Sequence, residues 1–144
     1  MKTVKQILAT KGRRLHTVEP TTTVFDALQK MADEDIGALV VLEGGALAGI
    51  LSERDYARKV ILKGRHSEAT PVSAIMTSNV VCVKSETRGD ACMSIMTENR
   101  VRHLVVRDEG KLSGVISMGD VVHAIIEDHE FTIEQLEHYI TSGR

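Results

Sequence analysis

Two four-residue segments carry the clearest potential for binding chemistry. Ser52 and Asp55 bracket the first segment, and Ser117 and Asp120 bracket the second, 65 positions later. A serine followed three residues later by an acid is typical of a helix start, where both side chains accept hydrogen bonds from free backbone N–H groups. A carboxylate at the end of a strand can instead accept from both hydroxyls of a ribose, because it has two acceptor oxygens. Both interpretations stay open, and the recurrence favours binding.

A basic cluster stands before an apolar strand in the second half of the chain. Arg100, Arg102 and His103 form this cluster. Arginine is well suited to bind phosphate through its fork of donors, whereas the alternative is a solvated strand end. Small residues at the matching place in the first half would leave room for a planar base. The positions 65 residues earlier are Asp35, Gly37 and Ala38.

A second basic patch precedes the first expected strand. It reads Lys11-Gly12-Arg13-Arg14. The patch is either a solvated loop or a group that reaches towards the phosphate of a ligand.

These residues belong to an internal repeat. Residues 37–61 align without a gap on residues 102–126, with shared Leu, Val, Gly, Ser and Asp positions. Each half of a 144-residue chain is too short to build a comfortable core alone. We therefore expect two copies of one unit that bury their apolar faces together, with pseudo-twofold symmetry.

Each copy is expected to run strand, helix, strand, strand, helix. In the first copy, we expect a lead-in helix, a strand at 15–18, a helix from Val24, a hairpin turning at Gly44-Gly45, and a helix from Ser52 to about Leu62. The second copy repeats this order, with its first strand at 80–83. We divide the chain into residues 1–66 (repeat 1 with its lead-in helix), 67–130 (repeat 2) and 131–144 (a helical tail).

The tail has apolar residues at helical spacing. They are Phe131, Ile133, Leu136, Tyr139 and Ile140. An amphipathic helix of this kind needs a surface to cover it. That surface is either its own module or a second chain.

Composition excludes several classes of function. The net charge of −2 lacks the basic excess of nonspecific nucleic-acid binding. No apolar stretch approaches the roughly 20 residues that span a bilayer, and residues 1–10 lack the apolar core of a signal peptide. We expect a cytoplasmic protein that binds neither nucleic acid nor membranes. Cys82 and Cys92 lack metal-ligand spacing and are expected to be strand or core thiols.

The combined motifs resemble the CBS-domain pair, or Bateman module, over residues 3–129. The resemblance rests on Ile75-Met76-Thr77, on the strand Gly37–Val41, and on two duplicated segments. These are Gly49-Ile50-Leu51-Ser52-Glu53-Arg54-Asp55 and Gly114-Val115-Ile116-Ser117-Met118-Gly119-Asp120, the second preceded by Val101–Val106. The resemblance implies an α+β (α/β-like) fold of two tandem β-α-β-β-α repeats. The family often has proline in its second strand, where this chain has Val40 and Val105.

The resemblance implies ligands that contain adenosine, such as AMP, ATP or NAD(H), in clefts between the repeats. Asp55 and Asp120 would hold ribose, and Arg102 and His103 would reach phosphates. Ile36, Gly37 and Ala38 would leave room for the adenosine. Asn79 and Val80 would border the Asp120 cleft, with Thr22 near the phosphate, whereas Arg14 and Leu15 would border the Asp55 cleft. The implied set also includes Ser52, Arg54, Ser117, Met118 and Gly119.

Two functions from different classes follow. The first is a free-standing nucleotide-binding regulatory module that signals by conformational or oligomeric change, as a homodimer, to an unidentified protein target. The second is a constitutive interaction or oligomerisation module whose clefts are vestigial. No catalytic constellation and no phosphate-binding glycine loop is present in the sequence, so we expect neither an enzyme nor a catalytic cofactor.

Overall fold

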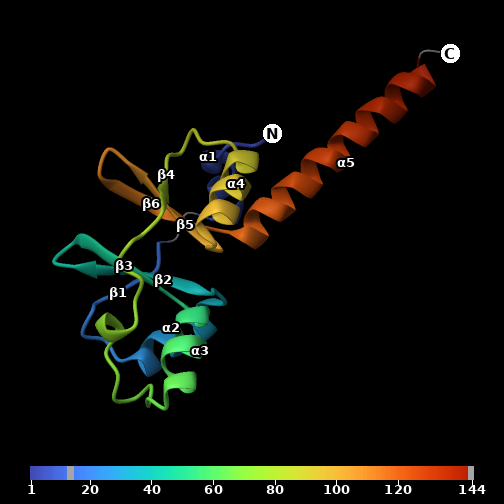
Figure 1. Cartoon of the computed structure of the whole chain (residues 1–144). Coiled ribbons are helices and arrows are strands. Elements are labelled where there is room, and N and C mark those ends of the chain that lie inside the picture. Colours follow the sequence, from blue (N-terminus) through green and yellow to red (C-terminus); the bar gives the residue numbers. More distant parts are fainter. Residues whose placement is uncertain (13–14, 143–144) are drawn as a thin grey trace. The chain divides into compact units, whose positions relative to one another are not determined.

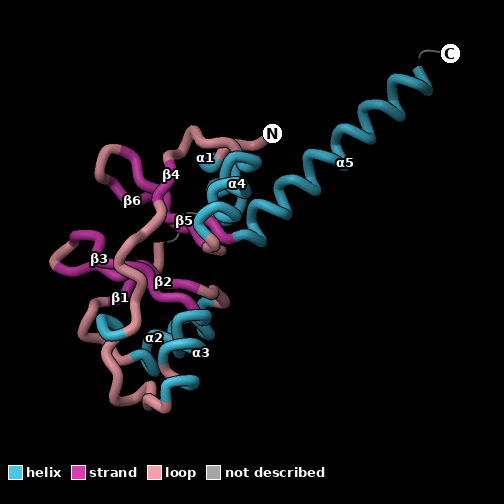
Figure 2. Tube along the Cα trace, in the orientation of Figure 1, coloured by secondary structure: helices cyan, strands magenta, loops and turns pink. Residues whose placement is uncertain are grey.

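A computed structural model describes residues 1–12 and 15–142. Its elements follow the expected order (Figures 1 and 2). In the first half these are α1 (Val4–Lys11), β1 (Thr17–Val18), α2 (Val24–Glu34), β2 (Ala38–Glu43), β3 (Ala46–Ser52), α3 (Glu53–Lys59) and the 3-10 helix η1 (Ile61–Lys63). In the second half they are the 3-10 helix η2 (Val72–Ala74), β4 (Cys82–Val83), α4 (Gly89–Asn99), β5 (His103–Asp108), β6 (Lys111–Ser117) and α5 (Met118–Ser142).

Each repeat builds its own three-stranded sheet with the same topology. β1 runs parallel to β2, and β2 forms an antiparallel hairpin with β3. β4, β5 and β6 repeat this order and these directions. The hairpins turn at Gly44-Gly45 and at Glu109-Gly110, all with positive φ, which matches the twist that tight hairpins need. The expected strand, helix, strand, strand, helix order is thus confirmed in both copies.

The chain nevertheless packs into compact units that differ from the sequence repeats. One unit combines Met1–Arg14 with Val81–Arg144, and the other is Leu15–Val80. We call these the outer unit and the inner unit, by their places along the chain. The lead-in segment of each repeat therefore joins the core of the other repeat. The division into repeats at residue 66 describes the sequence and stays a prediction, whereas the packing follows this different grouping.

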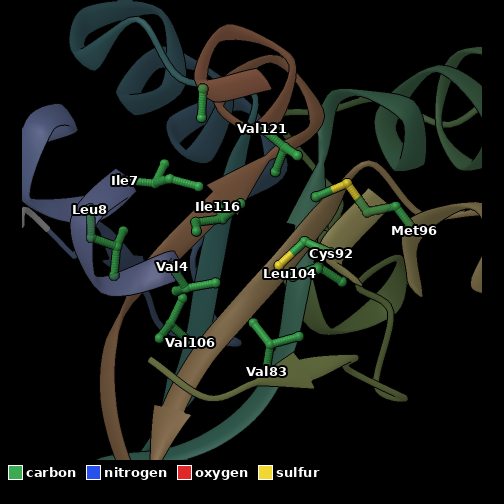
Figure 3. Close-up of a cluster of buried hydrophobic side chains, with 11 residues drawn as sticks. Val4, Ile7, Leu8, Val83, Cys92, Met96, Leu104, Val106, Ile116 and Val121 are labelled. Carbon is green, nitrogen blue, oxygen red and sulfur yellow. The ribbon is translucent and has the colours of Figure 1, made fainter. Parts of the chain in front are cut away.

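The core of the outer unit shows the exchange of the first lead-in segment (Figure 3). Val4, Ile7 and Leu8 of α1 are buried against residues of α4, β5, β6 and α5. Backbone hydrogen bonds fix the start of α1, from Val4 N to Thr87 O at 2.8 Å and from Gly89 N to Lys2 O at 2.9 Å. The other core residues are Val83, Cys92, Met96, Leu104, Val106, Ile116, Val121 and Ala124.

The inner unit receives the second lead-in segment in the same way. Val72 and Ile75 are buried with Leu39 and Leu51 in its core. Thr77 then pairs with Ile50 of β3 through two backbone hydrogen bonds of 2.9 Å each. Each exchanged segment thus lies beside the strand that leads to a Ser-x-x-Asp turn.

Some expected boundaries were wrong. β1 begins at Thr17 rather than Leu15, and β4 begins at Cys82 rather than Val80, because the pairing with the next strand starts only there. α3 ends at Lys59 rather than Leu62, and a 3-10 turn follows it that ends at Gly64 with φ of 67°. The tail is not a separate helix: α5 continues unbroken from Met118 to Ser142, because neither proline nor glycine interrupts it after Gly119.

Candidate functional site

The first Ser-x-x-Asp turn forms a complete capping box at the start of α3. Ser52 N donates to Asp55 Oδ2 at 3.0 Å, and Asp55 N donates to Ser52 Oγ at 3.2 Å. Two further donors reach the other carboxylate oxygen: Thr77 Oγ1 donates to Asp55 Oδ1 at 3.2 Å, and Lys59 Nζ lies 3.0 Å from the same oxygen. Asp55 is only 9% exposed. Both of its oxygens are therefore already engaged within the inner unit.

The second turn reproduces the backbone geometry but has different partners. Ser117 N donates to Asp120 Oδ2 at 2.9 Å, and Asp120 N donates to Ser117 Oγ at 3.1 Å. Lys11 Nζ, from the end of α1, donates to the same Oδ2 at 2.7 Å and to Val115 O at 3.0 Å. The carboxylate thus binds a lysine that lies more than 100 positions away in the sequence.

The pKa of Asp120 is held below its ordinary value. Burial is the largest single influence and by itself would raise this pKa. The hydrogen bonds from Lys11 and from Ser117, together with the positive charge of Lys11, outweigh it. Asp120 is therefore a carboxylate at neutral pH, which leaves its oxygens as acceptors only.

The two aspartates differ in their remaining capacity for a ligand. The donors to Asp120 all meet Oδ2, and no donor from the described residues meets Oδ1. The donors to Asp55 meet both oxygens. The Asp120 side chain is also more exposed, at 22% against 11%. Asp120 is thus the better placed to accept a hydroxyl from a bound molecule.

Each sheet brings the entrance of its middle strand to its Ser-x-x-Asp turn. In the inner unit, Ala38 pairs with Ser52, and Glu53 N donates to Gly37 O at 3.1 Å. In the outer unit, His103 pairs with Ser117, and Met118 N donates to Arg102 O at 2.8 Å. The predicted small residues and the predicted basic residues therefore each lie next to the turn of their own repeat.

The remaining predicted residues are distributed as follows. Leu15, Thr22, Asn79 and Val80 belong to the inner unit, so their predicted roles at the clefts stay predictions. Thr22 O accepts from Val72 N at 2.8 Å, which ties it to the exchanged segment. Arg54 and Gly119 are exposed at the starts of their helices, whereas Arg100 ends α4 in the left-handed conformation, with φ of 54°. Arg14 lies outside the described residues.

A small pocket lies beside the entrance of β2 in the inner unit. It encloses about 270 Å³ and is lined by Ile36 and Gly37 with two acids, Asp35 and Glu53. Typical small-molecule pockets enclose about 300–1,000 Å³. The volume of this pocket lies below that range, and its two acids make it a poor match for a phosphate.

Sequence reasoning missed the residues that engage the two carboxylates. Lys59 follows Asp55 by four positions, a spacing that predicts an ion pair along a helix. Thr77 and Lys11 have no such local signal, because their contacts depend on the exchange of the lead-in segments. Lys11 belonged to the patch interpreted as a solvated loop or a phosphate contact, and the structure places it on a carboxylate instead.

Comparison with known proteins decides the family. The family model of the CBS domain matches the chain twice, at residues 4–62 and 72–127. The chain belongs to the CBS-domain family. It is 44% identical to the CBS domain-containing protein CBSX3, mitochondrial, of Arabidopsis thaliana over 127 residues, which cover 84% of this chain and 61% of that one. The expected α+β fold with two CBS repeats is therefore confirmed.

Solved structures agree with this assignment. A protein with CBS domains from Burkholderia ambifaria MC40-6 is 50% identical with a TM-score of 0.85, over 88% of this chain and 96% of that one. CBSX2 in complex with AMP is 25% identical with a TM-score of 0.72, over 88% and 98%. The chain spans 61% of CBSX3 and 24% of CBSCBSPB5, both from Arabidopsis thaliana, so these curated relatives are longer than the matched segment.

Within residues 1–12 and 15–142, no helix is long and apolar enough to cross a membrane. Over the same residues, no cluster of three or more His, Cys, Asp or Glu side chains has an arrangement that could hold a metal ion. Cys92 is buried in the core of the outer unit and Cys82 is exposed in β4, so the two are a core and a strand cysteine, as expected.

Proposed function

We propose that this CBS-domain protein is a regulatory module that binds an adenosine-containing nucleotide, such as AMP, ATP or NAD(H), with Asp120 as the ribose ligand. Binding would change its conformation or its oligomeric state, and a protein target would respond to that change. The module does no chemistry on the nucleotide. The AMP complex of CBSX2 supports an adenine nucleotide as the ligand class.

The observation that carries the proposal is the difference between the two aspartates. Ribose presents two neighbouring hydroxyls, and a single carboxylate oxygen without other donors has two lone pairs with which to accept from them. Asp120 has an oxygen without a donor among the described residues, and Arg102 and His103 lie beside its turn, where the Arg102 guanidinium is a positive charge suited to phosphate. Asp55 has both oxygens engaged and small neighbours. The Asp120 turn is therefore proposed as the binding site, with a structural role for Asp55.

Calorimetric titration with AMP, ATP and NADH tests this proposal through a matched pair of variants. Asp120→Asn removes the charge and one acceptor at the proposed site, and Asp55→Asn makes the same change at the engaged turn. We expect Asp120→Asn to raise the dissociation constant of the tightest-binding of these ligands at least about 10-fold, which corresponds to a loss of roughly 1.4 kcal/mol of binding free energy. We expect Asp55→Asn to change nucleotide affinity by less than about 3-fold while lowering thermal stability.

The outcomes separate the proposal from its alternative. Equal weakening by both variants would show that the two turns bind equivalently and would refute the assignment to Asp120. If none of the three nucleotides binds protein shown by mass analysis to be free of bound ligand, the regulatory proposal fails. The vestigial interaction module would then be favoured, since the full engagement of Asp55 within the fold already agrees with a structural role for one turn.

The proposal includes self-association into a homodimer and a cytoplasmic location. Affinity capture with and without saturating nucleotide tests for a target, and only a nucleotide-dependent partner would support regulation. Fractionation of cells that express the tagged chain tests the location.

A further inference from the structure

Seven large apolar side chains of α5 are exposed. Five of them, together with His129, are spaced alternately by four and three residues, which is the repeat of a coiled-coil contact line, whereas Phe131 and Tyr139 lie off this line. We call this line the seam. The seam consists of Val122, Ile126, His129, Ile133, Leu136 and Ile140.

The seam is not part of the core of its own unit. Val121 and Ala124 are buried, yet Val122 and Ile126 on the neighbouring face remain 39% and 49% exposed. From residue 129 to residue 141 every side chain is exposed, and α5 extends beyond the other elements of its unit in Figure 1. A helix of about 12–15 residues is marginal in water without packing. The second half of α5 therefore needs a partner surface.

We propose that the seam pairs with the seam of a second copy of this chain, as a parallel two-stranded coiled coil. Isoleucine occupies every second seam position, at 126, 133 and 140. Valine or leucine occupies two of the alternate positions, and this distribution favours two parallel strands. A second copy supplies the same spacing over the same length, about 27 Å at 1.5 Å per residue. The inference deepens the proposed self-association by naming its surface.

The charges on α5 agree with this occupant and with its direction. α5 contains no lysine or arginine, which argues against an anionic membrane surface as the partner. Glu130 and Glu137 flank the seam on one side. In an antiparallel pair these flanking positions face each other, and the glutamates would repel. In a parallel pair they face Ile125 and Thr132 of the other chain, which carry no charge.

His129 is the one polar member of the seam. In a parallel pair it meets its own copy in the same layer, where two imidazoles pack less favourably than two leucines. A polar layer of this kind fixes the register of two helices at a cost in affinity. The histidine layer therefore acts as a register marker, and removing it should strengthen association.

Sedimentation velocity of the full chain, with matched variants, tests the proposal. Ile133 and Phe131 are exposed to similar extents, 55% and 63%, but only Ile133 lies on the seam. We expect the wild type to be a dimer, and Ile133→Glu to raise its dissociation constant at least about 100-fold. Phe131→Glu adds the same charge off the seam and should change the constant by less than about 3-fold. His129→Leu should lower it about 10-fold.

A cross-linking experiment tests the direction of the helices. His129→Cys and Leu136→Cys are made separately in a Cys82→Ser background, so that the buried Cys92 is the only other thiol. A parallel pair brings each new cysteine opposite itself, and both variants should form interchain disulfides under mild oxidation. An antiparallel pair can bring at most one of these positions opposite itself. Cross-linking at one position or at neither overturns the parallel arrangement.

Nucleotide titration of the same samples separates this inference from the proposed function. A monomeric wild type, or a dimer that survives Ile133→Glu, refutes the seam even if nucleotide still binds. A dimer that Ile133→Glu dissociates and Phe131→Glu preserves supports the seam even if no nucleotide binds. Far-UV circular dichroism of each variant establishes that the units remain folded.

Discussion

The contact between Lys11 and Asp120 allows a quantitative test of how the exchanged helix stabilises the outer unit. Lys11→Met removes the ammonium group and keeps most of the aliphatic stem. Exposed ion pairs contribute about 0.2–1 kcal/mol, whereas hydrogen bonds to charged groups contribute about 1.5–3 kcal/mol. The two side chains are 34% and 22% exposed, which places this pair between these cases. We expect the variant to lose about 1–2 kcal/mol of unfolding free energy at neutral pH.

The pH dependence of this loss follows from the lowered pKa of Asp120. A carboxylate whose pKa is lowered by folding stabilises the native state above its unfolded pKa, about 3.9, and this stabilisation disappears as the pH falls through the folded value. In the variant, burial still raises the pKa of Asp120, but the hydrogen bond and the positive charge of Lys11 no longer lower it. The loss begins near the unfolded pKa, which both proteins share, so the variant should lose less stability than the wild type as the pH falls below about 3.9. Their difference should shrink in acid, where Asp120 is protonated in both.

Urea unfolding at neutral and acidic pH measures both effects, and carboxyl NMR titration locates the pKa of Asp120. Lys5→Met is the control, because Lys5 lies on the same helix and is exposed. It should change unfolding free energy by less than about 0.5 kcal/mol. A loss in Lys11→Met that is independent of pH, or equal to the loss in Lys5→Met, would refute the assignment of stabilisation to the Lys11–Asp120 pair.

Two predictions concern backbone positions and rest on urea unfolding. Gly49→Ala should lower the unfolding free energy by about 1–3 kcal/mol, because its new methyl would lie 2.8 Å from Thr77 O. At Gly114, the atom nearest to such a methyl is the movable end of the Leu8 side chain, at 3.1 Å. Gly114→Ala should therefore cost clearly less, and equal losses would contradict this reasoning. Asp35→Gly should stabilise the inner unit by up to about 1 kcal/mol, because Asp35 ends α2 with φ of 53°, a conformation that glycine adopts without strain. A measured destabilisation would count against backbone strain at this position.

Local patterns predicted the elements of the fold well. The apolar run Leu39–Leu42, followed by Gly44-Gly45, indicates a hairpin, and β2 and β3 form it. The three threonines at 21–23 before Val24 indicate a helix start, and the side chain of Thr23 caps the helix by accepting from Asp26 N at 3.1 Å. The hairpin and the helix start are formed by residues that are close together in the sequence, so local patterns are sufficient to predict them.

The partners of the two carboxylates could not be predicted in the same way. The spacing of Val4, Ile7 and Leu8 predicts a helix with one apolar face, but it does not specify which core that face joins. Hydrophobic burial is non-directional, so either core satisfies the pattern. The contact of Lys11 with Asp120 follows only once α1 has been placed in the outer unit. The sequence pattern therefore predicts the two Ser-x-x-Asp turns, but it does not predict which side chains contact their carboxylates.

The exchange of the lead-in segments also sets the order in which the chain can finish folding. The inner unit is continuous in sequence, so it can close as soon as its own residues have been synthesised. α1 is made first, but the strands and helices that bury Val4, Ile7 and Leu8 all lie beyond residue 80. The apolar face of α1 therefore stays exposed until most of the chain has been synthesised. Contacts of such long sequence separation slow folding, so formation of the outer unit is expected to limit the overall rate.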